Sequence, residues 1–238
     1  MNKNVIREEW IDALPLDENG NVDLYSLFQA FQKAATRHAE EIDIGKDFYL
    51  PRHLLYVLCR IKAKFLAPFP KEGKIRLVTY ALMPGRVSFL RDCFLEDESG
   101  KRILLLKTLW VLIDEKRRRI VLTDPLCERM EGLKEDVLSL PDVFDEELTA
   151  LEEEEVSSPC LEYVVSEKDI DSNHHLNNTI YFRLVEKAGI QGRIKTLELD
   201  FEKECLLGDK ILVYRKGDYY CGYRRGELSF KCKIEESL

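Results

Sequence analysis

Eight residues in the second half of the chain, DSNHHLNN at 171–178, combine one acid, two histidines and three asparagines. If this stretch runs extended into the following helix, alternate side chains share one face. Asp171, Asn173 and His175 then project together, while His174 points away. Imidazole can take up a proton near neutral pH, and a carboxylate or amide can fix its tautomer. An amide and the N–H groups of a helix start can stabilise developing negative charge. These groups could therefore support attack on an ester-like carbonyl.

A purely structural role accounts for only part of this stretch. Asn177 or Asn178 can cap the helix, but capping needs a single residue. We expect no metal site, because adjacent histidines on an extended chain diverge and no third ligand stands at a recognised spacing. The sequence also lacks a G-x-S-x-G motif and a glycine-rich phosphate loop. The pattern favours acid–base chemistry without a metal or an organic cofactor.

The elements that position these residues can be read from apolar periodicity. Leu24, Leu27, Phe28 and Phe31 begin an apolar stripe that predicts a long amphipathic helix over 24–42, with an aspartate as its N-cap. His38 lies in this stripe and is predicted to be a core histidine. Strand-like runs separated by turn signals follow at 54–67, 74–83, 86–97 and 102–114. This order predicts an α+β unit in which an antiparallel sheet wraps around a helix.

The same pattern recurs in a shorter form after residue 158. A strand at 160–167 and a helix at 178–188 precede four strands, at 193–207, 209–217, 219–225 and 227–236. The segments DENGNVDLYSLF (17–28) and DSNHHLNNTIYF (171–182) share aspartate, asparagine and phenylalanine at their first, third and twelfth positions. We interpret the chain as a tandem duplication. His175 of the second copy corresponds to Asn21 of the first, so chemistry that depends on histidine belongs to the second copy alone.

Composition sets the remaining expectations. The chain of 238 residues is 45% hydrophobic and 34% charged with a formal net charge of −8, which suits a globular protein and argues against a nucleic-acid surface. No apolar run is long enough to span a membrane, and the N-terminus has no signal-peptide pattern, so a cytoplasmic location is predicted. The seven scattered cysteines suit reduced thiols. We predict domains at 1–130 and 159–238, joined by an acidic linker at 131–158.

The stretch DIDSNHHLNNTIYFRLVEKA resembles the signature of the acyl-acyl-carrier-protein (acyl-ACP) thioesterases, in which D-x-N-x-H-[VL]-N-N leads into the helix of a hotdog fold. The similarity continues in NGNVDLYSLFQAFQKAATRHA, FLRDCFLEDESGK, LWVLIDEKRRR and LELDFEKEC. It implies two tandem hotdog domains, each an antiparallel sheet wrapped around a central helix. The family's catalytic residues then fall on Asp171, Asn173 and His175, and the Glu-Cys pair of its plant members falls on Glu204 and Cys205.

The role of the Glu-Cys pair stays open in the sequence. The lack of a transit peptide makes the chain resemble a bacterial-type member, and in such members the cysteine is often replaced. In LELDFEKEC, regular strand alternation puts Cys205 on the apolar face and Glu204 on the opposite face. Without a bulge or a strand end, only one of the two can enter a site.

The resemblance implies a hydrolase that cleaves acyl-ACP to free fatty acid and ACP in fatty acid biosynthesis. Two alternatives remain, an acyl-CoA thioesterase of the same fold and a non-catalytic acyl-binding or regulatory protein. An acidic carrier needs a basic docking patch, for which Lys116 to Arg119 and Arg224 with Arg225 are candidates. The first domain is expected to contact the acyl chain through Leu27, Phe28 and Phe31. The sequence leaves a homodimer open.

Overall fold

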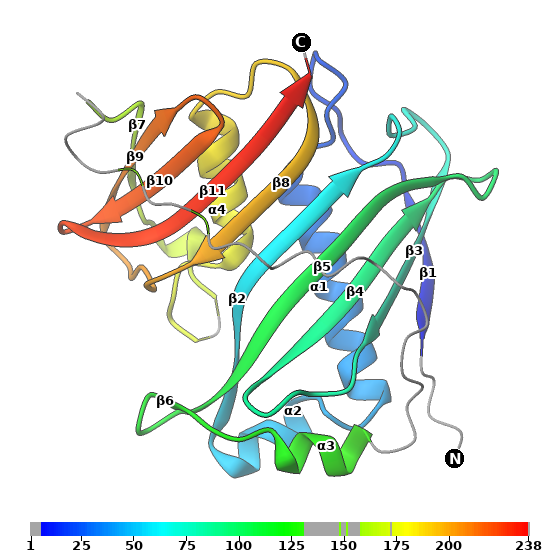
Figure 1. The fold of residues 1–238 in the computed structure, drawn as a ribbon, viewed down its shortest axis with the longest axis vertical. Coiled ribbons are helices and arrows are strands. Elements are labelled where there is room, and N and C mark those ends of the chain that lie inside the picture. Colours follow the sequence, from blue (N-terminus) through cyan, green and yellow to red (C-terminus); the bar gives the residue numbers. More distant parts are fainter. Residues whose placement is uncertain (1–5, 131–147, 149–150, 152–157, 172, 238) are drawn as a thin grey trace.

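A computed structural model describes residues 6–130, 148, 151, 158–171 and 173–237. These residues form one antiparallel sheet of eleven strands, with two long helices on the same face (Figure 1). Nearly all of the predicted acidic linker, 131–158, lies outside the described residues. Within the described part, no helix is long and apolar enough to cross a membrane.

The first half contributes six of the strands, and the second half contributes five. The first-half strands are β1 (Arg7–Asp12), β2 (Leu54–Phe65), β3 (Lys74–Ala81), β4 (Ser88–Glu96), β5 (Arg102–Asp114) and β6 (Arg119–Ile120). The second-half strands are β7 (Leu161–Val164), β8 (Arg193–Phe201), β9 (Lys210–Lys216), β10 (Tyr219–Arg224) and β11 (Glu227–Ser237). The helices are α1 (Leu24–Glu41), α2 (Lys46–Tyr49), α3 (Asp124–Met130) and α4 (Asn178–Lys187), with 3₁₀ turns η1 (Leu50–Arg52) and η3 (Glu167–Asp169).

The sheet order has the symmetry that the predicted duplication requires. From one edge it reads β1-β3-β4-β5-β2, and from the other edge β7-β9-β10-β11-β8, with β6 pairing only with β5. The halves meet where β2 pairs with β8, and Lys62 stands opposite Glu198 at the centre of that pairing. These two side chains form an ion pair. The prediction of an antiparallel α+β fold with one long helix in each half is confirmed.

Each long helix begins at the predicted residue and ends one residue before the predicted end. The Asp23 carboxylate accepts a hydrogen bond from Ser26 N at 2.7 Å and caps α1, and the Asn177 side chain accepts one from Thr179 N at 2.9 Å and caps α4. Helix α4 stops before Gly189, whose φ of +100° favours glycine.

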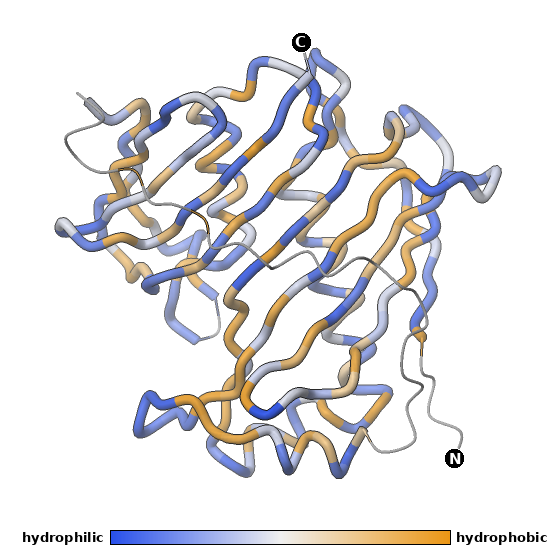
Figure 2. The backbone as a smooth tube through the Cα atoms, in the orientation of Figure 1, coloured by the Kyte–Doolittle hydropathy of each residue, from blue (hydrophilic) through white to orange (hydrophobic). Residues whose placement is uncertain are grey.

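Both helices pack on the apolar face of the sheet and against each other. Phe28 of α1 stacks on Phe182 of α4 with ring centroids 3.6 Å apart. In β8, Leu197 and Leu199 are fully buried on the helix face. Apolar and polar residues alternate along the central strands (Figure 2). One continuous hydrophobic core therefore spans both halves.

Candidate active site

The segment before α4 is a tight turn and not the extended strand that we predicted. One Asp171 carboxylate oxygen, Oδ1, accepts hydrogen bonds from Asn173 N at 2.8 Å and His175 N at 3.2 Å. His174 N donates to Asp171 O at 3.1 Å, and His174 has a left-handed φ of +64°. Aspartate favours such hydrogen bonds between its side chain and nearby backbone N–H groups, and here they stabilise a turn in place of an extended backbone. The alternating-face argument for these residues is therefore wrong.

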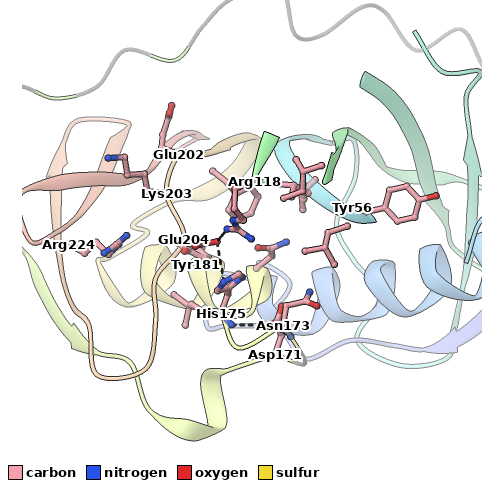
Figure 3. A pocket seen from close by; sticks show the side chains of 17 residues that line it. Tyr56, Arg118, Asp171, Asn173, His175, Tyr181, Glu202, Lys203, Glu204 and Arg224 are labelled. Carbon is pink, nitrogen blue, oxygen red and sulfur yellow. Dashed lines mark hydrogen bonds and ion pairs between the residues drawn. The ribbon is translucent and has the colours of Figure 1, made fainter. Parts of the chain in front are cut away.

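The turn nevertheless brings Asp171, Asn173 and His175 to one pocket of about 420 Å³. Glu204 lines the same pocket beside His175, and Arg118 reaches the pocket from the first half (Figure 3). His174 is exposed and is not part of the lining.

Glu204 lies beyond the end of β8, so strand alternation no longer fixes its direction. His175 Nε2 is 3.2 Å from Glu204 Oε2, and the Arg118 guanidinium contacts the same oxygen. The side chains of His175 and Glu204 are 26% and 40% exposed, so water can reach both. An imidazole and a carboxylate at this distance can share and transfer a proton.

Cys205 points away from this pocket. Its side chain is fully buried, and Sγ lies 3.0 Å from the Ser229 hydroxyl, in hydrogen-bonding range. Burial raises the pKa of the Cys205 thiol, which disfavours the thiolate. The structure thus brings four of the five predicted site residues together and places Cys205 in the core.

A second pocket, of about 470 Å³, adjoins the first and is lined mostly by residues of the first half. Four residues line both pockets, namely Leu55, Tyr56, Asp171 and Asn173. One wall of the second pocket is a face of α1 formed by Gln32, Ala35, Thr36 and Ala39. Phe89 and Trp110 also line this pocket.

The residues that we expected to contact an acyl chain are not in this lining. Leu27, Phe28 and Phe31 are at most 3% exposed and belong to the core. Helix α1 therefore has two neighbouring stripes. The bulky stripe packs beneath the sheet, and the stripe of smaller side chains leaves space for a ligand.

A buried arginine forms part of the second pocket. Arg91 is 4% exposed, and its Nη1 lies 2.9 Å from His38 Nδ1 and 3.3 Å from the Thr79 hydroxyl. Burial lowers the pKa of Arg91 to about 10. His38 is fully buried, which confirms the prediction of a core histidine.

The turn before α1 repeats the turn before α4. Asp17 Oδ1 accepts hydrogen bonds from Asn19 N and Asn21 N, at 2.9 and 2.8 Å. Asn21 is 8% exposed, donates from Nδ2 to Gly192 O at 3.0 Å and accepts from Ile194 N at 2.9 Å. Asn21, at the position that corresponds to His175, thus connects its turn to the start of β8 by hydrogen bonds. Its amide cannot act as an acid or a base.

Of the predicted basic residues, Arg118 and Arg224 line the first pocket. Arg225 Nη2 lies 2.7 Å from the buried Asp209, and Arg224 Nη1 lies 3.6 Å from it. Lys116, Arg117 and Arg119 are exposed. The sequence did not identify Arg118 as a site residue, because the run EKRRR shows the charge of Arg118 but not where its side chain points.

Among the described residues there is no cluster of three histidine, cysteine or acidic side chains that could hold a metal ion.

Comparison with known proteins gives two family matches and a set of similar folds. The profile of the acyl-ACP thioesterase N-terminal domain matches residues 4–129, and that of the C-terminal domain matches residues 152–237. No curated protein matches the sequence.

Solved structures with the same fold cover nearly the whole chain. An acyl-ACP thioesterase from Bacteroides thetaiotaomicron is 19% identical, with a TM-score of 0.82 and 100% of both chains covered. The 12:0-ACP thioesterase from Umbellularia californica is 17% identical, with a TM-score of 0.82 and 98% of both chains covered. At these identities the likeness establishes the fold.

Proposed function

Because the chain belongs to the acyl-ACP thioesterase family, we propose that the pocket of His175 and Glu204 is its hydrolytic site. The chain is a thioester hydrolase that acts on acyl-ACP. The observation that carries the assignment of the site is the distance of 3.2 Å between His175 Nε2 and Glu204 Oε2. This pair faces a pocket that adjoins a second one large enough for part of an acyl chain.

In the proposed mechanism, a water molecule is the nucleophile. The His175–Glu204 pair removes a proton from the water as its oxygen bonds to the thioester carbonyl carbon. The C–S bond then breaks, and the proton passes to the sulfur of the departing carrier thiol. The products are a fatty acid and the free carrier. The amide of Asn173 and the backbone N–H of Asn178 at the start of α4 stabilise the negative oxygen of the intermediate. Asp171 holds the turn that presents His175 and Asn173.

We leave Cys205 out of the chemical step. A cysteine nucleophile needs a thiolate within reach of its base and of the substrate carbonyl. The Cys205 thiol is buried, its pKa is raised, and it lies outside the pocket lining. A thioester is already an activated acyl donor, so an oriented water suffices.

The acyl chain is proposed to occupy the second pocket. The polar groups at its junction with the first pocket, Asp171 and Asn173, are where the thioester end would lie. The small residues Ala35 and Ala39 of α1 make room for the hydrocarbon. We propose ACP docking on the exposed cations Lys116, Arg117 and Arg119, which lie beside Arg118 in the sequence. The cytoplasmic location and the domain boundaries remain predictions.

A panel of acyl-ACP thioesters from short to long chains tests this proposal, with release of free thiol as the readout. Each chain length is also measured as the acyl-CoA. We expect a higher kcat/KM for the ACP thioester at the preferred length. Equal or higher kcat/KM on acyl-CoA would favour the alternative carrier. Wild-type turnover by both His175→Ala and Glu204→Gln would show that the site lies elsewhere.

A further inference from the structure

Glu204 is contacted from both halves of the chain. Arg118 Nη2 donates a hydrogen bond to Glu204 Oε2, and His175 Nε2 lies 3.2 Å from the same oxygen. In the pocket, Glu204 stands between the guanidinium of Arg118 and the imidazole of His175 (Figure 3). Arg118 precedes Glu204 by 86 residues and lies in the turn between β5 and β6.

The backbone of that turn is held by several hydrogen bonds. The Asp114 carboxylate accepts hydrogen bonds from Lys116 N at 3.0 Å and Arg117 N at 2.7 Å, and these bonds with backbone N–H groups lower the pKa of Asp114. Arg118 N donates to Asp114 O at 2.8 Å. Arg118 itself has a left-handed φ of +53°, which is unfavourable for a residue with a side chain. The turn thus fixes the point from which the Arg118 side chain leaves the backbone.

A role in folding stability is too small to explain this arrangement. The Arg118 and Glu204 side chains are 46% and 40% exposed, and an ion pair between exposed groups contributes little to folding stability. Glu204 lies past the end of β8, outside the regular pairing of that strand. A planar guanidinium with several donors can restrain a carboxylate in this position.

We propose that Arg118 is a positioning residue that orients the Glu204 carboxylate toward His175. The first half of the chain then completes the acid–base site of the second half, in addition to holding the acyl chain. This inference rests on the proposed function, in which Glu204 acts with His175 on water.

The test compares Arg118→Ala, Arg118→Lys and the matched control Arg86→Ala, at an exposed arginine outside both pockets, on one acyl-ACP thioester. We expect Arg118→Ala to lower kcat by about 10-fold or more with little change in KM. Removing a residue that orients a functional group typically lowers activity by this factor. Arg118→Lys should bring kcat back to within about 3-fold of the wild-type value, because lysine keeps the positive charge. The remaining loss reflects the missing planar guanidinium. The control should keep wild-type kcat, because Arg86 lies neither in the pocket nor among the proposed docking residues.

A double-mutant cycle separates this inference from the proposed function. If Arg118 acts through Glu204, adding Arg118→Ala to Glu204→Gln lowers kcat no further. An additive loss, a rise in KM at unchanged kcat, or wild-type kcat in Arg118→Ala would each overturn the positioning role. Wild-type kcat in Glu204→Gln alone would instead overturn the proposed site, whatever Arg118→Ala does.

Discussion

Pro68 occupies in the first repeat the place that Glu204 occupies in the second. The two residues after β2, Leu66 and Ala67, both donate from their backbone N–H groups to Ile103 O. The two residues after β8 make the same paired contact with Ser229 O. The next residue is Pro68 in one case and Glu204 in the other. With Asn21 at the histidine position, neither member of the acid–base pair is present in the first repeat.

Replacing His175 with alanine should lower kcat by at least about 100-fold, the usual effect of removing a general base. His174→Ala is the matched control, because its neighbouring imidazole is exposed and lies outside the pocket. The control should keep most of the activity. Steady-state kinetics on one acyl-ACP and a thermal unfolding curve for each variant provide the measurement. Similar losses in both variants would contradict the assignment of His175.

Asn21→Ala should lower folding stability and leave activity unchanged, the reverse of the effect expected for His175→Ala. It removes the partners of the buried Gly192 carbonyl and Ile194 N–H, which should cost about 1–3 kcal/mol of unfolding free energy. Hydrolysis per folded molecule should stay near the wild-type rate. Urea denaturation and kcat on the same preparation check both values. A loss of kcat as deep as that of His175→Ala would mean that the first repeat takes part in the chemistry.

Cys205→Ala should keep a substantial fraction of wild-type kcat, because water and not the thiol attacks the substrate. Some stability should be lost, since Cys205 is fully buried beside Ser229. Intact-protein mass spectrometry of a quenched turnover should show no acyl adduct on the wild-type chain. An acyl group trapped on Cys205 would establish a covalent mechanism instead.

Ala39→Phe should shift the preference toward shorter acyl chains. Ala39 lines the second pocket, so a larger ring there removes volume that a long chain would use. Lys33→Phe, on an exposed position of the same helix, is the matched control. Relative kcat/KM across the acyl-ACP panel is the readout. An unchanged profile in Ala39→Phe would indicate that the chain binds outside this pocket.

Glu186 should make folding stability fall as the pH rises. Its pKa is raised from 4.5 to about 7, mainly by burial and also by the charges of Asp23 and Asp17, while the hydrogen bond from Leu24 N and the charge of Arg183 oppose this rise. The folded state therefore binds a proton that the unfolded state releases, and the resulting stability is present below about pH 4.5 and lost by about pH 7. Partial exposure limits the effect to about 3 kcal/mol at most.

Urea unfolding of the wild type and Glu186→Gln at pH 5 and pH 8 tests this linkage. The substitution should raise stability at pH 8 more than at pH 5, because glutamine keeps an acceptor for Leu24 N without the charge. Glu128→Gln, on an exposed position of α3, should leave the difference between the two pH values unchanged. The same pH dependence in Glu186→Gln and the wild type would rule out Glu186 as its source.

Most of the fold could be predicted because its signals are local. The apolar stripes of α1 and α4, their caps at Asp23 and Asn177, and the long alternating strands all follow from neighbouring residues. Strand β1 was missed because its sequence, REEWID, is largely charged, as befits an edge strand of the sheet. Strand β6 and the short helices α2 and α3 are too brief to show a period.

The site was predictable in its residue types but not in its geometry. The composition of the turn before α4 pointed to Asp171, Asn173 and His175, yet the reason offered, an extended backbone, was wrong. The contact of Arg118 with Glu204 joins loops from opposite halves. Such long-range pairing leaves no periodic trace in the chain, so only the folded arrangement reveals it.

The stacked rings of Phe28 and Phe182 have the form of an isologous dimer contact within one polypeptide. The two residues are equivalent in the repeats, and each meets its own counterpart as it would across a two-fold axis. The pairing of β2 with β8 has the same self-complementary register. In a homodimer encoded by one gene, every mutation changes both subunits at once. Fusion removes that constraint, so one repeat can lose its catalytic groups and specialise in holding the chain of the substrate while the other keeps them.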